Sequence, residues 1–151
     1  MLSRVWIAVF CIAFSSLSLA AGDGIIKKQS QYSVTETLDR LENILKKKGI
    51  SVAVRWDHGR KAQQAGITLP ETEILIFGNP KLGSPLMQSN QQIGLDLPMK
   101  ALAYKDEQGK VWLVYNDPAY LKQRHGITKH DPIFKKMSAA LNKLTNKAVN
   151  P

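Results

Sequence analysis

An apolar run at the start of the chain decides how much of the sequence is available for folding. Residues 5–20 follow a lone Arg4 and contain nothing more polar than serine. The run is short of the roughly 20 residues that cross a bilayer, and Ser18 and Ala20 supply the small side chains that signal peptidase accepts. We therefore expect a signal peptide over residues 1–20, cleaved after Ala20 or alternatively after Gly22, and a periplasmic protein. An uncleaved membrane anchor is the alternative.

Removal of this segment leaves a chain without cysteine. Cys11 is the only cysteine and lies inside the apolar run, whereas a lipoprotein cysteine would stand at its end. The remaining 130 or so residues therefore offer no disulfide and no thiolate for catalysis or metal binding. They suffice for one domain of ordinary size but not for two.

The exported chain is basic. Arg4 is the only one of the 21 Lys and Arg residues within residues 1–20, which leaves 20 basic against 12 acidic residues and a net charge near +8. Solubility alone accounts for such a charge. Among partners, it favours anionic lipid, cell wall or a small anionic ligand over nucleic acid.

The first half of the chain alternates between strand and helix patterns. Residues 25–30 are expected to form a first strand within an N-terminal segment, residues 21–30. Ser33 and Glu36 form a capping box, and apolar residues recur at helical spacing until Gly49. Residues 50–56 alternate as in a strand with one covered face, and residues 57–66 are polar with a short helical turn. Residues 74–77 are continuously apolar, which suits a central strand.

The second half predicts a hairpin and two helices. Residues 100–105 and 110–115 flank a four-residue turn that ends in Gly109. Asp117-Pro118 and Asp131-Pro132 each place a capping residue before a proline, so helices are expected to about residue 125 and over residues 132–146. Residues 147–151 are expected to form a disordered tail. The order indicates a single two-layer α+β domain over residues 31–146, with a mainly antiparallel sheet of about five strands.

The stretch after the apolar strand, residues 78–85, has two glycines at the spacing of a phosphate-binding loop. That loop requires Lys and then Ser or Thr after the second glycine, whereas Gly83 is followed by Ser84 and Pro85. Proline also removes one of the amides that would bind an anion. We interpret the stretch as a turn at Asn79-Pro80 followed by a helix capped by Ser84.

Histidine can act as a base or as a metal ligand. The three histidines, His58, His125 and His130, have no short ligand spacing, so no metal site and no cofactor is assigned. A hydrolase triad of Ser84, His58 and Asp117 lacks the Gly-x-Ser-x-Gly turn, and no catalytic residue is assigned. The aromatic residues of the strands are explained by core packing.

The segments RWDHGRKAQQAG, TEILIFGNPKLGSPLMQ and GLDLPMKALAYKDEQGKVWLVYNDPAYLKQRHGI together resemble the bacterial family called domain of unknown function 302. The resemblance covers residues 31–127. It implies a small α+β domain that packs as a homodimer, in a family without a settled activity. The positions that match the family's recurring residues are Asp57, His58, Gly78, Asn79, Pro80, Pro85, Asp96, Pro98, Tyr115, Asn116, Asp117 and His125.

Polar residues at strand ends suggest where a ligand would bind. The candidate ligand-binding residues are Asp57, His58, Asn79, Lys81, Ser84, Asn116, Asp117 and His125. The leading hypothesis is a periplasmic homodimeric ligand-binding or accessory domain with a cleft lined by these residues. The alternatives are a metal-dependent or acid–base enzyme that uses His58 and His125, and a purely structural or interaction protein.

Overall fold

The computed structural model describes residues 23–151, and the expected signal peptide over residues 1–20 lies outside them. The strands are β1 (Ile25–Ser30), β2 (Ser51–Asp57), β3 (Thr72–Gly78), β4 (Met99–Lys105) and β5 (Val111–Asn116). The helices are α1 (Val34–Lys47), α2 (His58–Gln64), α3 (Pro80–Ser89), α4 (Pro118–Arg124) and α5 (Asp131–Val149), with a 3₁₀ helix, η1 (Gln91–Leu95). The order of strands and helices that the sequence predicts is confirmed.

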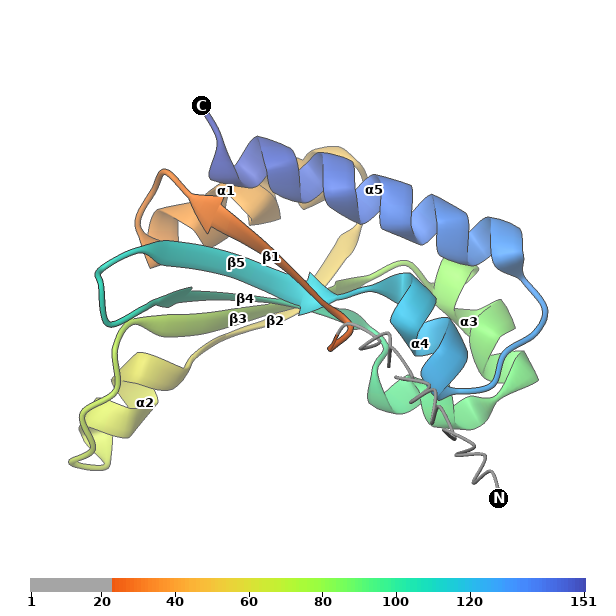
Figure 1. The fold of residues 1–151 in the computed structure, drawn as a ribbon, viewed down its shortest axis with the longest axis horizontal. Helices are drawn as coiled ribbons and strands as arrows, with labels where there is room; N and C mark the ends of the chain where they lie inside the picture. Colours follow the sequence, from red (N-terminus) through yellow and green to blue (C-terminus); the bar gives the residue numbers. More distant parts are fainter. Residues whose placement is uncertain (1–22) are drawn as a thin grey trace, which may run out of the picture.

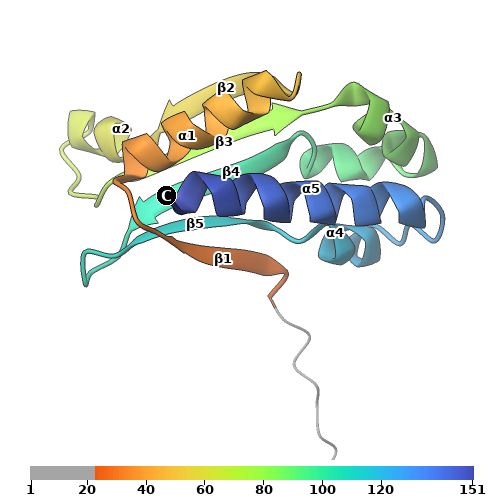
Figure 2. The same cartoon turned by 90° about the horizontal axis from the view of Figure 1, so that it is seen from above.

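The five strands form one sheet in the order β1-β5-β4-β3-β2, and every neighbouring pair is antiparallel. The two long helices, α1 and α5, lie side by side on one face of this sheet (Figures 1 and 2). The shorter helices stand at the ends of the strands, with α2 at one end and α3 and α4 at the other (Figure 1). The predicted two-layer α+β architecture is therefore confirmed.

The core lies between the sheet and these two helices. Ser33 begins α1 as expected, because its hydroxyl accepts a hydrogen bond from the Glu36 amide, and Gly49 ends the turn after the helix at a φ of 67°. Along each inner strand, side chains point alternately toward the helices and toward the other face of the sheet, as the two-residue period of a strand requires. The fully buried core side chains include Val34, Leu38, Leu41, Leu45, Leu75, Leu113 and Leu121.

The C-terminal end of α5 is held by a side chain from α1. The Arg40 guanidinium donates to the carbonyls of Ala148 (3.0 Å), Lys147 (3.2 Å) and Asn150 (2.7 Å), and it stacks on the Tyr32 ring. Val149 is buried, and its carbonyl accepts a hydrogen bond from the amide of Gln31. The predicted disordered tail over residues 147–151 is therefore wrong, because these contacts extend the helix to Val149.

The start of α5 also differs from the expectation. His130, in the left-handed region at a φ of 67°, is the residue before the helix and makes no side-chain cap. Asp131, expected to cap it, is instead the first helical residue, and its carboxylate pairs with Lys122 of α4. The pKa of Asp131 lies below its usual range because of that hydrogen bond and charge. Proline at the second position still fits a helix start.

Strand β2 lies at the edge of the sheet. The prediction that one of its faces is covered is wrong beyond the midpoint of the strand. Its pairing with β3 shifts between Val52 and Val54, which indicates a bulge. Val52 packs against the core, but Val54 and Trp56 are exposed by 45% and 47%. Arg55 takes the helix-facing side instead, where it binds Glu73 of β3 and Asp39 of α1.

The sheet face opposite the two long helices is left open over much of its area (Figure 1). In the register, Trp56 lies opposite Ile74, Ile74 opposite Leu102, and Leu102 opposite Val114. Ile74 and Ile76 therefore belong to an interior strand, as predicted, but only one of its faces is covered by helices. We call the residues Ile25, Val54, Trp56, Ile74, Ile76, Leu102, Tyr104, Trp112 and Val114 the open apolar face.

Replacing Arg40 by Met tests the link between α1 and the end of α5. Arg40→Met keeps an apolar stem but removes the charged donors from three carbonyls, so we expect a loss of about 1–3 kcal/mol in the free energy of unfolding. Urea denaturation of the folded domain measures it. Arg60→Met, a change at an exposed position of α2, is the control and should change the free energy by less than about 0.5 kcal/mol. Equal effects of the two variants would contradict the role given to Arg40.

Candidate functional site

An apolar pocket of about 420 Å³ lies where α3 and α5 meet the end of the sheet. Its walls come from the start of β2, the end of β3, α3, the segment before β4, and α5. The lining residues are Ile50, Ser51, Ala53, Phe77, Gly78, Asn79, Pro80, Leu82, Gly83, Ser84, Met87, Gly94, Leu97, Pro98, Met99, Met137, Ala140, Leu141 and Leu144. Its volume lies in the range of small-molecule sites.

Small residues account for the space. Protein interiors are normally filled to the density of organic crystals, so an opening of this size requires side chains that do not reach across it. Gly83 of α3, Gly94 of η1 and Ala140 of α5 each contribute a wall position with at most a methyl group. A Cβ added to Gly83 would meet only ordinary contacts, with Leu97 at 3.6 Å and Met87 at 3.9 Å. The pocket is thus built by side-chain size on elements that are well separated in sequence.

Helix α3 begins at the pocket earlier than expected. Asn79 is its cap, and its side-chain oxygen accepts a hydrogen bond from the Lys81 amide at 2.9 Å. Pro80 takes the first helical position, so the predicted turn at Asn79-Pro80 with a helix start at Ser84 is wrong. Ser84 and Pro85 lie inside the helix. An Asn cap followed by Pro is as good a helix start as Ser-Pro, and the earlier one prevails here.

The end of β3 approaches the start of β4 closely. A Cβ on Gly78 would stand 3.1 Å from Cβ of Pro98, which leaves little room for any larger residue. The peptide bond between Leu97 and Pro98 is cis, and both residues line the pocket. The glycine that resembled part of a phosphate loop therefore serves a close backbone approach.

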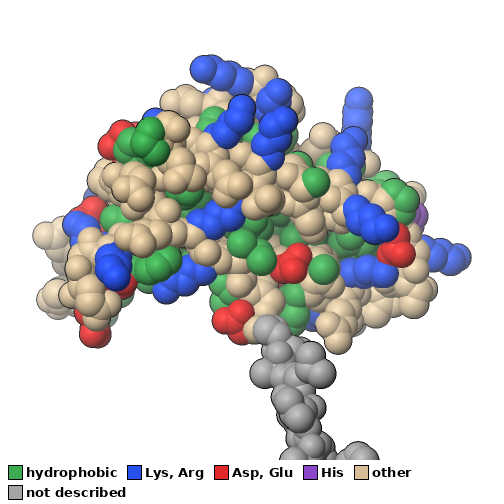
Figure 3. All heavy atoms as spheres, turned by 45° about the horizontal axis from the view of Figure 1, so that its top comes forward, with side chains coloured by type: hydrophobic (Ala, Val, Ile, Leu, Met, Phe, Trp, Pro, Cys, Tyr) green, Lys and Arg blue, Asp and Glu red, His purple; other side chains and the backbone are tan. Residues whose placement is uncertain are grey.

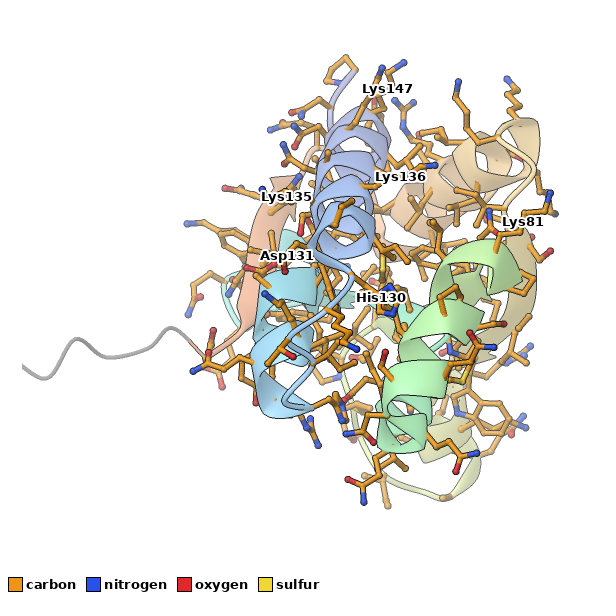
Figure 4. The ribbon with its side chains drawn as sticks, turned by 90° about the vertical axis from the view of Figure 1, so that its right-hand side faces the viewer. Lys81, His130, Asp131, Lys135, Lys136 and Lys147 are labelled. Atoms are coloured by element: carbon orange, nitrogen blue, oxygen red, sulfur yellow. The ribbon has the colours of Figure 1, made fainter. Side chains whose placement is uncertain are left out.

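Lysines flank this pocket. Lys81 is the second residue of α3, and Lys136 lies one residue before the pocket residue Met137. Figure 4, which looks at this end of the molecule, shows Lys81 and Lys136 on either side of the space between α3 and α5, with His130 below them. His130 bonds to the Ser89 hydroxyl at 3.0 Å through its Nε2. None of the pocket residues is acidic.

The structure separates the predicted ligand-binding residues into groups. Asn79 and Ser84 line the pocket and Lys81 lies at its edge, so three of the candidate residues lie close together. Asp57 pairs with Glu73, five residues along β3 from Gly78, which places it roughly 17 Å away at the other end of the strand. There Asp57 caps α2, its carboxylate accepting from the Arg60 amide, and His58 is exposed at the start of that helix.

Asn116, Asp117 and His125 lie at the pocket end of the sheet but have other partners. Asn116 ends β5 opposite Ile25, and Asp117 caps α4 by accepting from the Ala119 amide at 2.9 Å. His125 Nε2 lies 2.5 Å from a carboxylate oxygen of Asp96, and both side chains are nearly buried. This pair joins the end of α4 to η1. The single cleft that sequence reasoning predicted is not formed by these residues.

The arrangement also bears on the predicted enzyme alternative. His58 and His125 stand at opposite ends of the strands, so they do not share a site. Over residues 23–151, no group of three or more His, Cys, Asp or Glu residues is placed to hold a metal ion. The hydrolase triad is not assembled either, because Ser84 and His58 are separated in the same way.

Sequence reasoning missed one polar cluster around the partly buried Lys28. The Lys28 ammonium of β1 donates to Thr145 Oγ1 (2.8 Å), Asn142 Oδ1 (2.7 Å) and Asn146 Oδ1 (2.6 Å) of α5. Burial lowers its pKa, and burial raises the pKa of the neighbouring Tyr115 phenol. The Asn and Thr residues stand at helical spacing on α5, which was the available signal. Their partner could not be identified because the pairing of β1 with the sheet was unknown.

None of the helices within residues 23–151 combines the length and hydropathy that a membrane crossing requires.

Three proteins of the genus Brucella share sequence with part of this chain. The "Fluoride-specific ion channel FluC 1" of Brucella suis biovar 1 (strain 1330) is 51% identical over 104 residues, which are 69% of this chain and 41% of the relative. The proteins named FluC 1 in Brucella abortus biovar 1 (strain 9-941) and FluC 2 in Brucella melitensis biotype 1 (strain ATCC 23456) have the same identity over 38% of their lengths. The chain thus spans about two fifths of these curated relatives.

A solved structure and a family assignment agree with the fold. The crystal structure of an uncharacterized conserved protein DUF302 from Bacillus stearothermophilus superposes with a TM-score of 0.66 at 23% identity, over 84% of this chain and 96% of that one. Residues 26–144 match the family described as "Domain of unknown function DUF302". Because the match covers most of the chain, the protein is a member of the DUF302 family.

Proposed function

We propose that this protein is an exported accessory module that binds an apolar small molecule in the pocket between α3 and α5. The observation that carries the proposal is the pocket itself, since its lining is almost wholly apolar and combines residues from four segments that are separate in sequence. Ligand sites of proteins are typically concave, mostly apolar and supplied with a few polar groups, here Ser51, Asn79 and Ser84. Of the predicted ligand-binding residues, Asn79, Lys81 and Ser84 belong to this proposal.

Filling the pocket tests its use. Phe in place of Ala140 projects a ring into the space, so Ala140→Phe should lower the affinity for the neutral fluorescent probe N-phenyl-1-naphthylamine at least tenfold, as read from its emission. Ala139→Phe, an exposed neighbour on α5, is the matched control and should bind the probe like the parent protein. Circular dichroism verifies that both variants fold. Failure of the parent protein to bind the probe would contradict the proposed function.

We also propose that two copies pair through the open apolar face. Ile25, Val54 and Trp56 are each close to half exposed in the single chain, and the inner strands add apolar side chains between them. Lys27 lies over the Trp112 and Tyr104 rings and Lys61 over the Trp56 ring, so cations border these apolar side chains. An exposed apolar cluster rimmed by polar groups marks an interaction site. A second copy related by a twofold axis presents the same surface, so pairing would cover the open apolar face of each copy.

A lysine at position 56 tests the pairing. Trp56→Lys places a charge on the open apolar face and should convert a dimer into a monomer, because a buried unpaired charge is costly. Light scattering after size exclusion gives the mass in solution. Ala139→Lys is the control, since Ala139 is exposed on α5, which covers the opposite face of the sheet (Figure 1). A parent protein that is already monomeric at micromolar concentration would contradict the pairing.

Two further observations support an accessory role outside the cytoplasm. The apolar run over residues 5–20 ends in the small residues that a signal peptidase accepts. The curated relatives contain a similar segment within proteins named fluoride-specific ion channels, which supports a family role beside membrane proteins. We therefore place the mature domain in the periplasm, where it would serve a membrane-bound partner or deliver a ligand.

Ala20 provides a test of export. Ala20→Leu removes a small side chain from the position before the first expected cut and from the third position before the cut after Gly22, so uncleaved precursor should accumulate. The mass of the protein in periplasmic and membrane fractions shows it. Leu19 is neither the first nor the third residue before either expected cut, so Leu19→Ala should be processed normally. Normal processing of the Ala20→Leu protein would argue against both cleavage sites.

A further inference from the structure

We infer that the ligand of the pocket is a single-chain amphiphile with an anionic carboxylate head, and that lysines along α5 and at the start of α3 hold this head at the pocket entrance. The inference rests on the proposed function and specifies its ligand class. It depends on where cations stand relative to the apolar lining, on their lack of acidic partners, and on the size of the space.

The lysines of α5 run along one border of the pocket. At 3.6 residues per turn, Lys136, Lys143 and Lys147 fall within about 40° of one another around the helix and flank Ala140. Ala140 is partly exposed, whereas Met137, Leu141 and Leu144 on the other side of the pocket stripe are buried. The row of lysines therefore borders the pocket on its solvent side. We call Lys81, Lys136, Lys143 and Lys147 the lysine rim.

The rim is not neutralised by the protein. Among residues 23–151, the salt bridges of lysines involve Lys46, Lys105 and Lys122, so the rim lysines have no acidic partner there. The only acidic residue of α5 is Asp131, which pairs with Lys122. In Figure 3, which brings the α5 side forward, Lys and Arg side chains outnumber Asp and Glu side chains. An anion at the entrance would thus meet positive potential without competition.

The apolar interior fits a hydrocarbon chain better than a compact anion. Inorganic phosphate or a dicarboxylate would leave about 420 Å³ of apolar space unused. The space lies in the size range of small-molecule sites and is lined by apolar groups, so a hydrocarbon chain can occupy it. Each buried methylene contributes about 0.8 kcal/mol of transfer free energy, which makes the chain the main source of affinity. The lysine rim then selects the charge of the head.

Displacement of N-phenyl-1-naphthylamine from the full mature protein tests the inference. Dodecanoate, 1-dodecanol and dodecyltrimethylammonium share one chain length and differ in head charge. Dodecanoate should displace the probe at about one tenth of the concentration that 1-dodecanol requires, and the cation should be the weakest, since a few solvent-exposed lysines together supply an effect of this size. The advantage of dodecanoate should shrink as the salt concentration rises.

Matched variants separate the possible results. Lys81→Gln/Lys136→Gln should reduce the preference for dodecanoate over 1-dodecanol at least threefold, a ratio taken after the probe affinity of the variant itself is measured. Lys61→Gln/Lys110→Gln, which removes the same charge at the other end of the strands, should keep the preference. Probe binding with equal displacement by all three amphiphiles would overturn this inference alone, whereas absent probe binding would overturn the proposed function. The lysines could instead bind a membrane surface, which co-sedimentation with anionic vesicles measures. Co-sedimentation that requires the lysine rim but is unchanged by Ala140→Phe, together with no preference for dodecanoate, would overturn the inference.

Discussion

The structure depends on a sheet that is covered by long helices on one face only. Alternation along the inner strands directs one set of side chains, including Leu75, Ala101 and Leu113, into the core beneath α1 and α5. The other set contributes to the open apolar face. Within residues 23–151 no further long helix covers that face, so its apolar residues stay partly exposed in the single chain. The short helices are displaced to the strand ends, and one of these ends holds the pocket.

Much of the fold could be predicted because local signals and long-range packing agree. The capping box at Ser33, the glycine after α1 and the four-residue turn before β5 are local features, and each stands where it was expected. The end of α5 could not be predicted, because Arg40 lies more than a hundred residues away and its contact with the last carbonyls depends on how α1 and α5 pack. The exposure of Trp56 depends on a bulge, which leaves little trace in a single sequence.

The candidate site was predictable only in part, for a related reason. The sequence predicts a cleft lined by the Asn79–Ser84 loop because polar residues follow a strand there, but the same reasoning expects the other polar strand ends to converge on it. In an antiparallel sheet, successive strand ends point in opposite directions, so Asp57 and Asn79 lie at opposite ends. The actual opposite wall is made by Met137, Ala140 and Leu144, which in sequence look like an ordinary core stripe. A space left by small side chains becomes visible only after the elements are packed.

The early start of α3 has a dynamic consequence for the pocket. Gly83 and Pro85 stand inside a helix of ten residues, where they cost about 1 and about 3 kcal/mol relative to Ala, and Pro85 leaves the Lys81 carbonyl without its helical donor. The opposite wall, α5, has nineteen residues, no internal proline and an end held by Arg40. The free energy of local opening is therefore lower for α3 than for α5. Under the proposed function, an apolar chain would enter through fluctuation of α3 rather than of α5.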